Sequence, residues 1–376
     1  MEFRRRLRQR SLAMAATLAA GTLLLSACSL LGGDDGTGSA QETGAVRANI
    51  ECAEKGKVLG AGSTAQQNAM KLWTKTYQDA CKPVQVAYWA QGSTAGVSKF
   101  LLGNTAFGGS DSPLKPSHVE QSQQVCPGGR AIDLPMLGGP IAIGYNLSNV
   151  PDLVLDAPTL AKIFDAKITT WNDPAIQALN PGAALPALPI NAVHRTDGSG
   201  TTKNFAAYLA GAAPKQWPYT PENEWKGQGG SGASGSENLA NQVQSTDGAI
   251  GYFELSFATA RKMHTVKIAT GAPQPVPASV ETATAGIATA ELVGEAGDLT
   301  LKLDYATKND GAYPIVLITY EIVCNKGNKP ETLPALKSFL TYTASEKGQA
   351  VLADAHYSRL PPVILTKVRQ AIETLS

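Results

Sequence analysis

Short apolar runs typical of strands alternate along this chain with segments whose apolar residues recur at helical spacing. The strand-like runs cover residues 58–59, 84–90, 131–147, 188–195, 248–254 and 312–323. The helical patterns cover residues 70–81, 97–103, 158–172 and 201–211, and most of the last fifty residues. In the first of them, Met70, Trp73, Tyr77 and Cys81 share one face. This alternation predicts an α/β fold with a mostly parallel sheet.

Three turns between an expected strand and an expected helix share one composition. They are GAGSTA at 60–65, QGSTAG at 91–96 and RTDGSGTT at 195–202. Glycine lets the backbone turn tightly and approach a ligand. The start of a helix leaves N–H groups unpaired at the positive end of the helix dipole, and hydroxyls add further donors. Each turn is therefore suited to bind an anion, at the carboxyl ends of strands where ligands of open α/β sheets bind.

The same turns have a simpler interpretation, because a serine or threonine before a helix is also an ordinary N-cap. The repetition favours the anion site, since the motif occurs three times. The third turn also carries Arg195, whose guanidinium offers a fork of donors that suits a tetrahedral oxyanion. Asp197, two residues further on, either orients that guanidinium or caps the following helix.

Other ligand and enzyme classes lack their motifs. The chain has no G-x-x-x-x-G-K-[ST], and no G-x-G-x-x-G follows an expected strand. It has no G-x-S-x-G, and Arg195 next to His194 disfavours a neutral general base, although a spatial Ser–His–Asp triad stays open. The four histidines are scattered and no Cys-x-x-Cys occurs, which disfavours zinc. We therefore expect a binding protein without a cofactor rather than an enzyme.

The first 28 residues are typical of an export signal. Five arginines precede an uncharged apolar run, 12–25, that is too short to span a bilayer comfortably. The run ends in Leu25-Ser26-Ala27-Cys28, which resembles a bacterial lipobox and implies cleavage before Cys28 and lipidation of its sulfur. An ordinary signal peptide with a chance cysteine is the alternative. Residues 28–48 are rich in Gly, Asp, Ser and Thr and predict a flexible tether.

Charge and length narrow the remaining chain further. The 376 residues have a net charge of +1, but residues 1–27 hold five arginines and one glutamate, so the rest carries −3. This balance disfavours a nucleic-acid-binding protein. The length predicts two domains, each large enough for its own core.

Four cysteines remain after Cys28, and an even number in an exported chain predicts two disulfides. They are Cys52, Cys81, Cys126 and Cys324. Sequence alone allows three pairings. We favour Cys52–Cys81 with Cys126–Cys324, because the first two bracket the first strand–helix unit.

The motifs GAGST, QGSTAGV, FGGSDSPL and HRTDGSGTTKNF, in this order with strand-like runs between them, resemble the phosphate-binding proteins of ABC-type phosphate importers, the PstS family. The resemblance covers residues 56–370. It implies a two-lobed periplasmic-binding-protein-like fold of type II, in which each lobe is a mixed sheet flanked by helices and hinge strands join the lobes. Lobe I would comprise 49–137 plus 312–376 and lobe II 138–311, with closure upon binding.

The resemblance also implies the ligand set. Matched residue by residue, it comprises Ser63, Thr64, Ala65, Ser93, Asp111, Arg195, Ser199, Gly200 and Thr201, with Asp197 orienting Arg195. Many relatives carry Phe where this chain has Ala65, so water exclusion there is weaker or comes from another side chain. The Gly/Ser run at 227–236 replaces a less repetitive segment and forms either part of the cleft mouth or loose surface.

Asp111 carries the expected selectivity. A carboxylate beside a bound anion is repulsive unless the ligand has a proton that the carboxylate accepts. Phosphate near neutral pH has such a proton and sulfate does not, so sulfate would leave two acceptors facing each other. Without the family resemblance, an Asp-Ser-Pro turn would be the simpler role of Asp111.

The expected function is therefore a monomeric, lipid-anchored receptor on the outer face of the cytoplasmic membrane. It would capture inorganic phosphate between its lobes and pass it to the permease subunits of an ABC transporter, without binding nucleic acid. A receptor for sulfate, molybdate or a phosphonate is one alternative. A surface phosphatase, or an adhesin or sensor on the same fold, is another.

Overall fold

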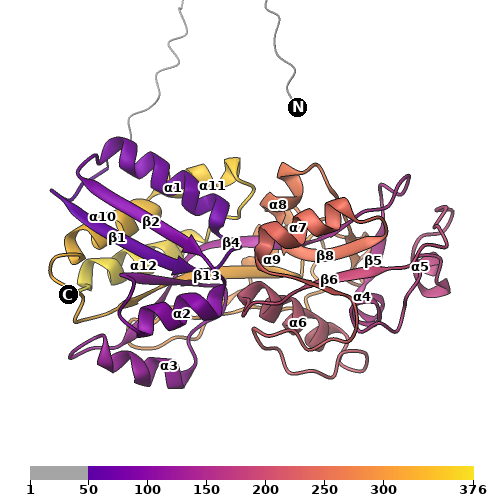
Figure 1. Ribbon diagram of the computed structural model, residues 1–376, viewed down its shortest axis with the longest axis horizontal. Helices are drawn as coiled ribbons and strands as arrows, with labels where there is room; N and C mark the ends of the chain where they lie inside the picture. Colours follow the sequence, from indigo (N-terminus) through magenta and orange to yellow (C-terminus); the bar gives the residue numbers. More distant parts are fainter. Residues whose placement is uncertain (1–49) are drawn as a thin grey trace, which may run out of the picture. The chain divides into compact units, whose positions relative to one another are not determined.

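The computed structural model describes residues 50–376, and these residues belong to one compact unit (Figure 1). The predicted signal peptide, Cys28 and the tether lie outside the described residues. The strands are β1 (Gly56–Gly62), β2 (Val84–Ala90), β3 (Phe107–Ser110), β4 (Ala131–Tyr145), β5 (Val154–Asp156), β6 (Asn191–Arg195), β7 (Ser231–Ala233), β8 (Ala249–Glu254), β9 (His264–Thr265), β10 (Lys267–Ala269), β11 (Glu291–Leu292), β12 (Leu301–Lys302) and β13 (Val316–Cys324).

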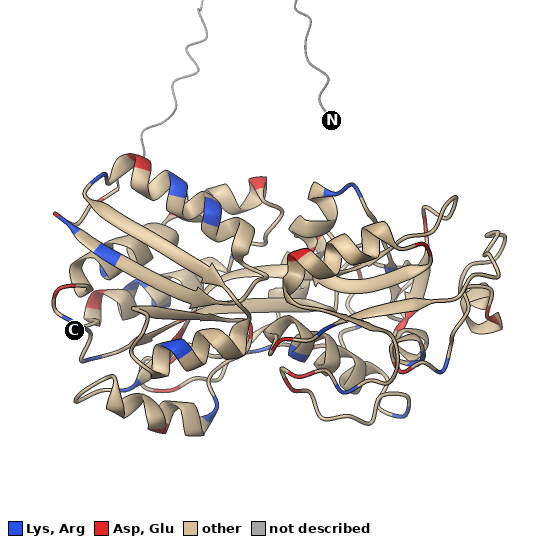
Figure 2. Cartoon of the chain, in the orientation of Figure 1, with Lys and Arg blue, Asp and Glu red and all other residues tan. Residues whose placement is uncertain are grey.

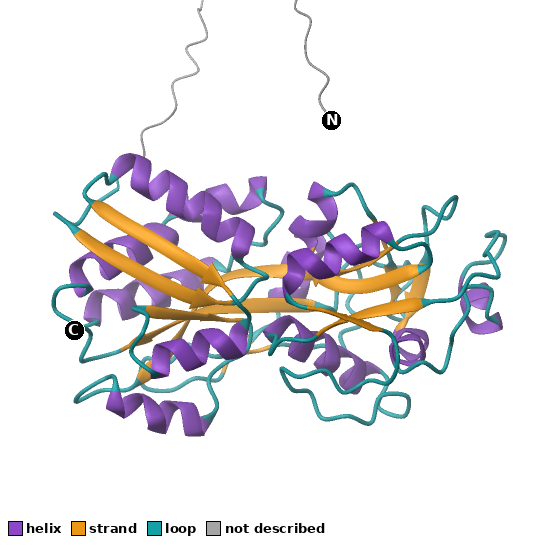
Figure 3. Ribbon diagram, viewed as in Figure 1, coloured by secondary structure: helices purple, strands orange, loops and turns teal. Residues whose placement is uncertain are grey.

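Helices surround the strands, as Figure 3 shows by colour. They are α1 (Gln67–Ala80), α2 (Ser93–Leu101), α3 (Pro116–Gln121), α4 (Ala157–Phe164), α5 (Pro174–Leu179), α6 (Gly200–Ala212), α7 (Gly235–Ser245), α8 (Leu255–Ala260), α9 (Val280–Ile287), α10 (Leu333–Thr343), α11 (Glu346–Asp354) and α12 (Pro362–Thr374), with a 3₁₀ turn, η1, at Ser122–Gln124. Among the described residues, none of the helices is long and apolar enough to cross a bilayer.

One nine-stranded sheet runs through the described part of the chain. Its order is β2-β1-β3-β13-β4-β8-β6-β7, and β9 also pairs with β4. The fold class is confirmed, and the sheet is mixed as the family resemblance implies. The mostly parallel sheet expected from the strand–helix alternation is wrong, because β4 and β13 run antiparallel to their neighbours.

The two long strands β4 and β13 form the middle of this sheet. β4 pairs with β13 along its first part, from Ala131 to Pro140, and with β8 from Ile141 to Tyr145. Every residue of both strands is buried. Their nearly unbroken apolar sequence follows, since strands covered on both faces need no polar alternation.

The lobe boundaries at 137/138 and 311/312 remain a prediction. The first falls within β4 and the second lies shortly before β13. Both strands continue from the half of the sheet that holds β1–β3 to the half that holds β6–β8. The crossing segments expected between lobes are thus strands of one continuous sheet.

The expected helix over 158–172 is much shorter in the structure. α4 ends at Phe164, and Ala166 adopts a left-handed backbone with φ of 52°. Ile168 and Trp171 are nevertheless buried, so the loop continues the apolar spacing without continuing the helix. Buried loop residues therefore imitate a helical pattern here.

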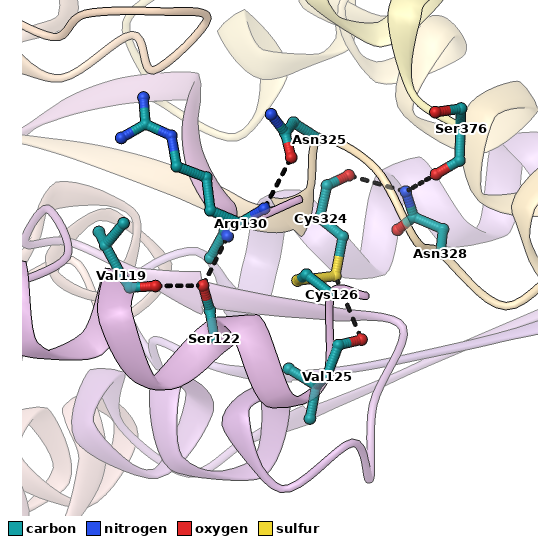
Figure 4. The surroundings of a disulfide bond; sticks show 10 residues. Val119, Ser122, Val125, Cys126, Arg130, Cys324, Asn325, Asn328 and Ser376 are labelled. Carbon is teal, nitrogen blue, oxygen red and sulfur yellow. Dashed lines mark hydrogen bonds between the residues drawn. A yellow bond between two sulfur atoms is a disulfide. The ribbon is translucent and has the colours of Figure 1, made fainter. Parts of the chain in front are cut away.

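Two disulfides, Cys52–Cys81 and Cys126–Cys324, are present in the pairing that we favoured from the sequence. The first attaches the start of the described chain to the end of α1. The second joins the segment after η1 to the end of β13, as Figure 4 shows. In the same view, Asn328 donates hydrogen bonds to the carbonyls of Cys324 and Ser376, which holds the carboxyl-terminal residue beside this disulfide.

Candidate anion-binding site

The three glycine-rich turns follow β1, β2 and β6, and each leads into a helix: α1, α2 and α6. The second and third turns meet directly. The Gly200 N–H donates to Ser93 Oγ at 3.0 Å, and the Thr94 N–H donates to the Gly198 carbonyl at 3.1 Å. A Cβ on Gly200 would lie 2.7 Å from both Ser93 Oγ and the Asp111 Cβ, so only glycine permits this approach.

Asp111 follows β3 and is almost completely buried among donors. Its Oδ1 accepts a hydrogen bond from Thr319 Oγ1 at 2.8 Å, and its Oδ2 accepts one from Thr201 Oγ1 at 3.0 Å. Its N–H donates to Ser93 Oγ. Burial raises the pKa of Asp111, whereas its hydroxyl partners and the charge of Arg195 act in the opposite direction.

Arg195, at the end of β6, is buried with its guanidinium held by Asp197. Its Nε donates to Asp197 Oδ1 at 2.7 Å, and its Nη2 donates to Asp197 Oδ2. Asp197 Oδ1 also accepts the Gly235 N–H at 2.9 Å. Burial works against ionisation of Asp197, but the hydrogen bond and charge of Arg195 outweigh it and lower the pKa of Asp197. This geometry is the one expected of an orienting carboxylate.

The first turn reaches the same place through Thr64. Thr64 Oγ1 lies 2.8 Å from Ser236 Oγ, and Ser236 Oγ accepts from Arg195 Nη1 at 3.3 Å. Ser63 Oγ accepts the Ala65 N–H at 3.0 Å within the turn. Ala65 is completely buried, and its carbonyl accepts a hydrogen bond from Tyr357 at 2.6 Å. Tyr357 therefore covers the position where many relatives carry Phe.

Of the predicted ligand residues, Ser199 has a second duty. Its hydroxyl accepts the Thr202 N–H at 3.1 Å, so it is the N-cap of α6. The other predicted residues are brought together in one buried network by the hydrogen bonds above.

Three members of this network were missed from the sequence. Thr319 is a polar residue inside the apolar strand β13, and that exception was its signal. Ser236 ends the Gly/Ser run, which repeats the composition of the three turns and leads from β7 into α7. Asn204 donates to the Asp111 carbonyl at 2.7 Å and to the Gly200 carbonyl at 2.8 Å, and helix spacing from Gly200 could have found it.

The cluster suits a small ion rather than an extended ligand. Its side chains are buried where the turns meet. A hollow of about 940 Å³ lies elsewhere, between α1 and β2, and none of the predicted ligand residues lines it. Among the described residues there is no group of three or more His, Cys, Asp or Glu side chains that could hold a metal ion. Figure 2 shows basic and acidic residues interspersed on both halves of the sheet, without a continuous basic face.

This fold and this buried donor cluster are those of a periplasmic-type binding protein. The PBP superfamily domain matches residues 38–347. The chain is 43% identical over 364 residues to the phosphate-binding protein PstS 3 of Mycobacterium leprae, covering 96% of this chain and 97% of that protein. It is 41% identical over 372 residues to PstS 2 of Mycobacterium tuberculosis, covering 98% and 99%. The chain belongs to the PstS family of phosphate-binding proteins.

Solved structures agree with the fold. A high-affinity periplasmic phosphate-binding protein, PfluDING, bound with phosphate, aligns with a TM-score of 0.69 at 20% identity, over 84% of this chain and 93% of that chain. A putative phosphate ABC transporter substrate-binding protein from Clostridium perfringens, also with bound phosphate, aligns with a TM-score of 0.58 at 21% identity, over 81% and 100%.

Proposed function

We propose that this chain binds inorganic phosphate and delivers it to the permease of an ABC-type importer. The observation that carries the proposal is Asp111, an acid with both oxygens hydrogen-bonded, in a cluster otherwise made of donors. Arg195 and the unpaired N–H groups at the starts of α2 and α6 would neutralise the ion.

The role of Asp111 follows from its bonding capacity. Each carboxylate oxygen has two lone pairs, and threonine hydroxyls take one on each. A further lone pair remains to accept the proton of a monoprotonated or diprotonated phosphate. Sulfate would place an unprotonated oxygen against that lone pair, which leaves a buried acceptor unpaired.

The direct test is calorimetric titration of the purified chain with phosphate, sulfate, molybdate and a phosphonate. Phosphate is expected to bind most tightly, and equal or tighter binding of another anion would assign the site to that anion. Turnover of a chromogenic phosphate ester would indicate an enzyme instead. The His194 ring stacks on Trp225 with centroids 5.3 Å apart, an arrangement that favours a packing role for this histidine.

We also propose that the chain is exported and anchored through Cys28 on the outer face of the cytoplasmic membrane. The lipobox-like sequence before Cys28 supports this, and PfluDING is named a periplasmic protein. Mass spectrometry of the mature chain is expected to find a diacylglyceryl group on Cys28. The Cys28→Ala variant should lose that group, and an unmodified Cys28 in the wild type would refute the anchor.

A further inference from the structure

Ser236 lies at the meeting point of two elements that hold the proposed ligand. It is the second residue of α7 and is completely buried. Its N–H donates to Thr64 Oγ1 at 3.1 Å, and the two hydroxyl oxygens lie 2.8 Å apart. Arg195 Nη1 donates to Ser236 Oγ at 3.3 Å. Ser236 is therefore bonded to the first turn and to the guanidinium at once.

These bonds leave Arg195 with a defined pair of free donors. A guanidinium has five N–H groups. Asp197 takes the one on Nε and one on Nη2, and Ser236 takes one on Nη1. One N–H on each terminal nitrogen remains, which is the parallel pair that binds two oxygens of a phosphate.

The same bonds also decide which way the Thr64 hydroxyl points. Ser236 Oγ accepts from Arg195, so its own hydrogen is free to be donated to Thr64 Oγ1. Thr64 Oγ1 then accepts both the N–H and the O–H of Ser236, which occupies its two lone pairs. The hydrogen of Thr64 must consequently be donated elsewhere, toward an acceptor in the cluster.

We propose that Ser236 is a positioning residue that makes this side of the site donate only. Hydrogen bonds run from Arg195 to Ser236 and from Ser236 to Thr64, and Thr64 then donates to the ligand. Unprotonated phosphate oxygens fit this side, so the protonated oxygen is directed to Asp111. The inference rests on the proposed phosphate-binding function and adds a specificity-determining residue to it.

The test compares Ser236→Ala with Ser234→Ala, a matched control in the same turn whose side chain is exposed and makes no capping hydrogen bond. In calorimetry, S236A is expected to bind phosphate about ten-fold more weakly than the wild type, and S234A within about two-fold. Ser236→Cys keeps nearly the same side-chain size with a weaker donor and acceptor, and is expected to lose affinity as well.

A double-mutant cycle with Thr64→Val distinguishes positioning from a general structural effect. If Ser236 acts through Thr64, the loss in the double variant is smaller than the product of the two single losses. Multiplicative losses would overturn the inference, and so would full affinity in both S236A and S236C. A wild-type chain that binds no phosphate would instead overturn the proposed function itself.

Discussion

At the scale of single residues, Asp111 is an acceptor whose two oxygens are held by hydroxyls from different elements, α6 and β13. The Asp111→Asn change replaces one acceptor with an NH₂ donor. We expect phosphate binding to weaken, while the preference for phosphate over sulfate falls further, by roughly ten-fold or more, because the amide can donate to sulfate. Titration with both anions measures the ratio. The exposed Asp310→Asn is the control, and an unchanged ratio in the Asp111 variant would contradict the proton-acceptor role.

Arg195 contributes the positive charge of the site. Arg195→Ala removes a buried charged donor and leaves Asp197 without its partner. We expect phosphate affinity to fall by at least about 1.5–3 kcal/mol, the usual contribution of hydrogen bonds to charged groups. Calorimetry measures the loss, and the exposed Arg359→Ala serves as the control. An unaltered dissociation constant would exclude Arg195 from the ligand set.

Sequence predicted most of the site residues because turn chemistry is local. Ser93 and Arg195 lie in glycine-rich turns whose composition alone indicates an anion. Thr319 and Ser236 were missed because their roles depend on tertiary contacts. A threonine within a strand is ordinary, and only the antiparallel approach of β13 to β3 brings Thr319 to Asp111. Ser236 stood in a run whose repetitive composition allowed loose surface as an interpretation.

At the scale of elements, Asp133 links β4 to the segment before β12. Its Oδ2 accepts from the Leu114 N–H at 2.9 Å, and its N–H donates to Asp298 Oδ1 at 2.7 Å. Burial, followed by the nearby charge of Asp298, raises the pKa of Asp133 to about 8. The folded state therefore keeps a proton that the unfolded chain releases near its ordinary pKa of about 4.

The resulting prediction concerns stability against pH. Because the folded pKa is raised, the contribution of Asp133 is fully present below about pH 4 and is lost as the pH rises toward about 8. Asp133→Asn should remove this slope, so that the variant gains stability relative to the wild type as the pH rises through this window. Urea unfolding at several pH values measures it, with Asp310→Asn as the control. Parallel curves for wild type and Asp133→Asn would refute the assignment.

Elements were predictable where period and flanking turns agreed, as for the strand at 84–90, which matches β2. They were not where burial imitated a helix, as in the loop after α4. The mixed sheet could not be read from strand–helix alternation, because the direction of β4 relative to β13 depends on pairing between segments far apart in the sequence.

At the scale of the whole molecule, the ligand set comes from both halves of the sheet, from β1–β3 on one side and β6–β7 on the other. A ligand that bonds both halves stabilises the folded state by mass action. At a free phosphate concentration of 100 times the dissociation constant, the free energy of unfolding should rise by about 2.7 kcal/mol. Calorimetric melting with phosphate measures this rise. Sulfate at equal concentration is the control, and an equal shift with sulfate would contradict selective binding.

The register shift between Thr319 and Tyr320 in β13 has one more consequence. Thr319 belongs to a strand that both halves of the sheet share, whereas Thr201 belongs to α6, which packs on the second half. A change in the twist of β13 would therefore alter the Thr319–Asp111 bond separately from the Thr201–Asp111 bond. The acid at the centre of the site would thus sense the bending of the sheet through one of its two oxygens, which couples the release of an ion to the mechanics of the backbone.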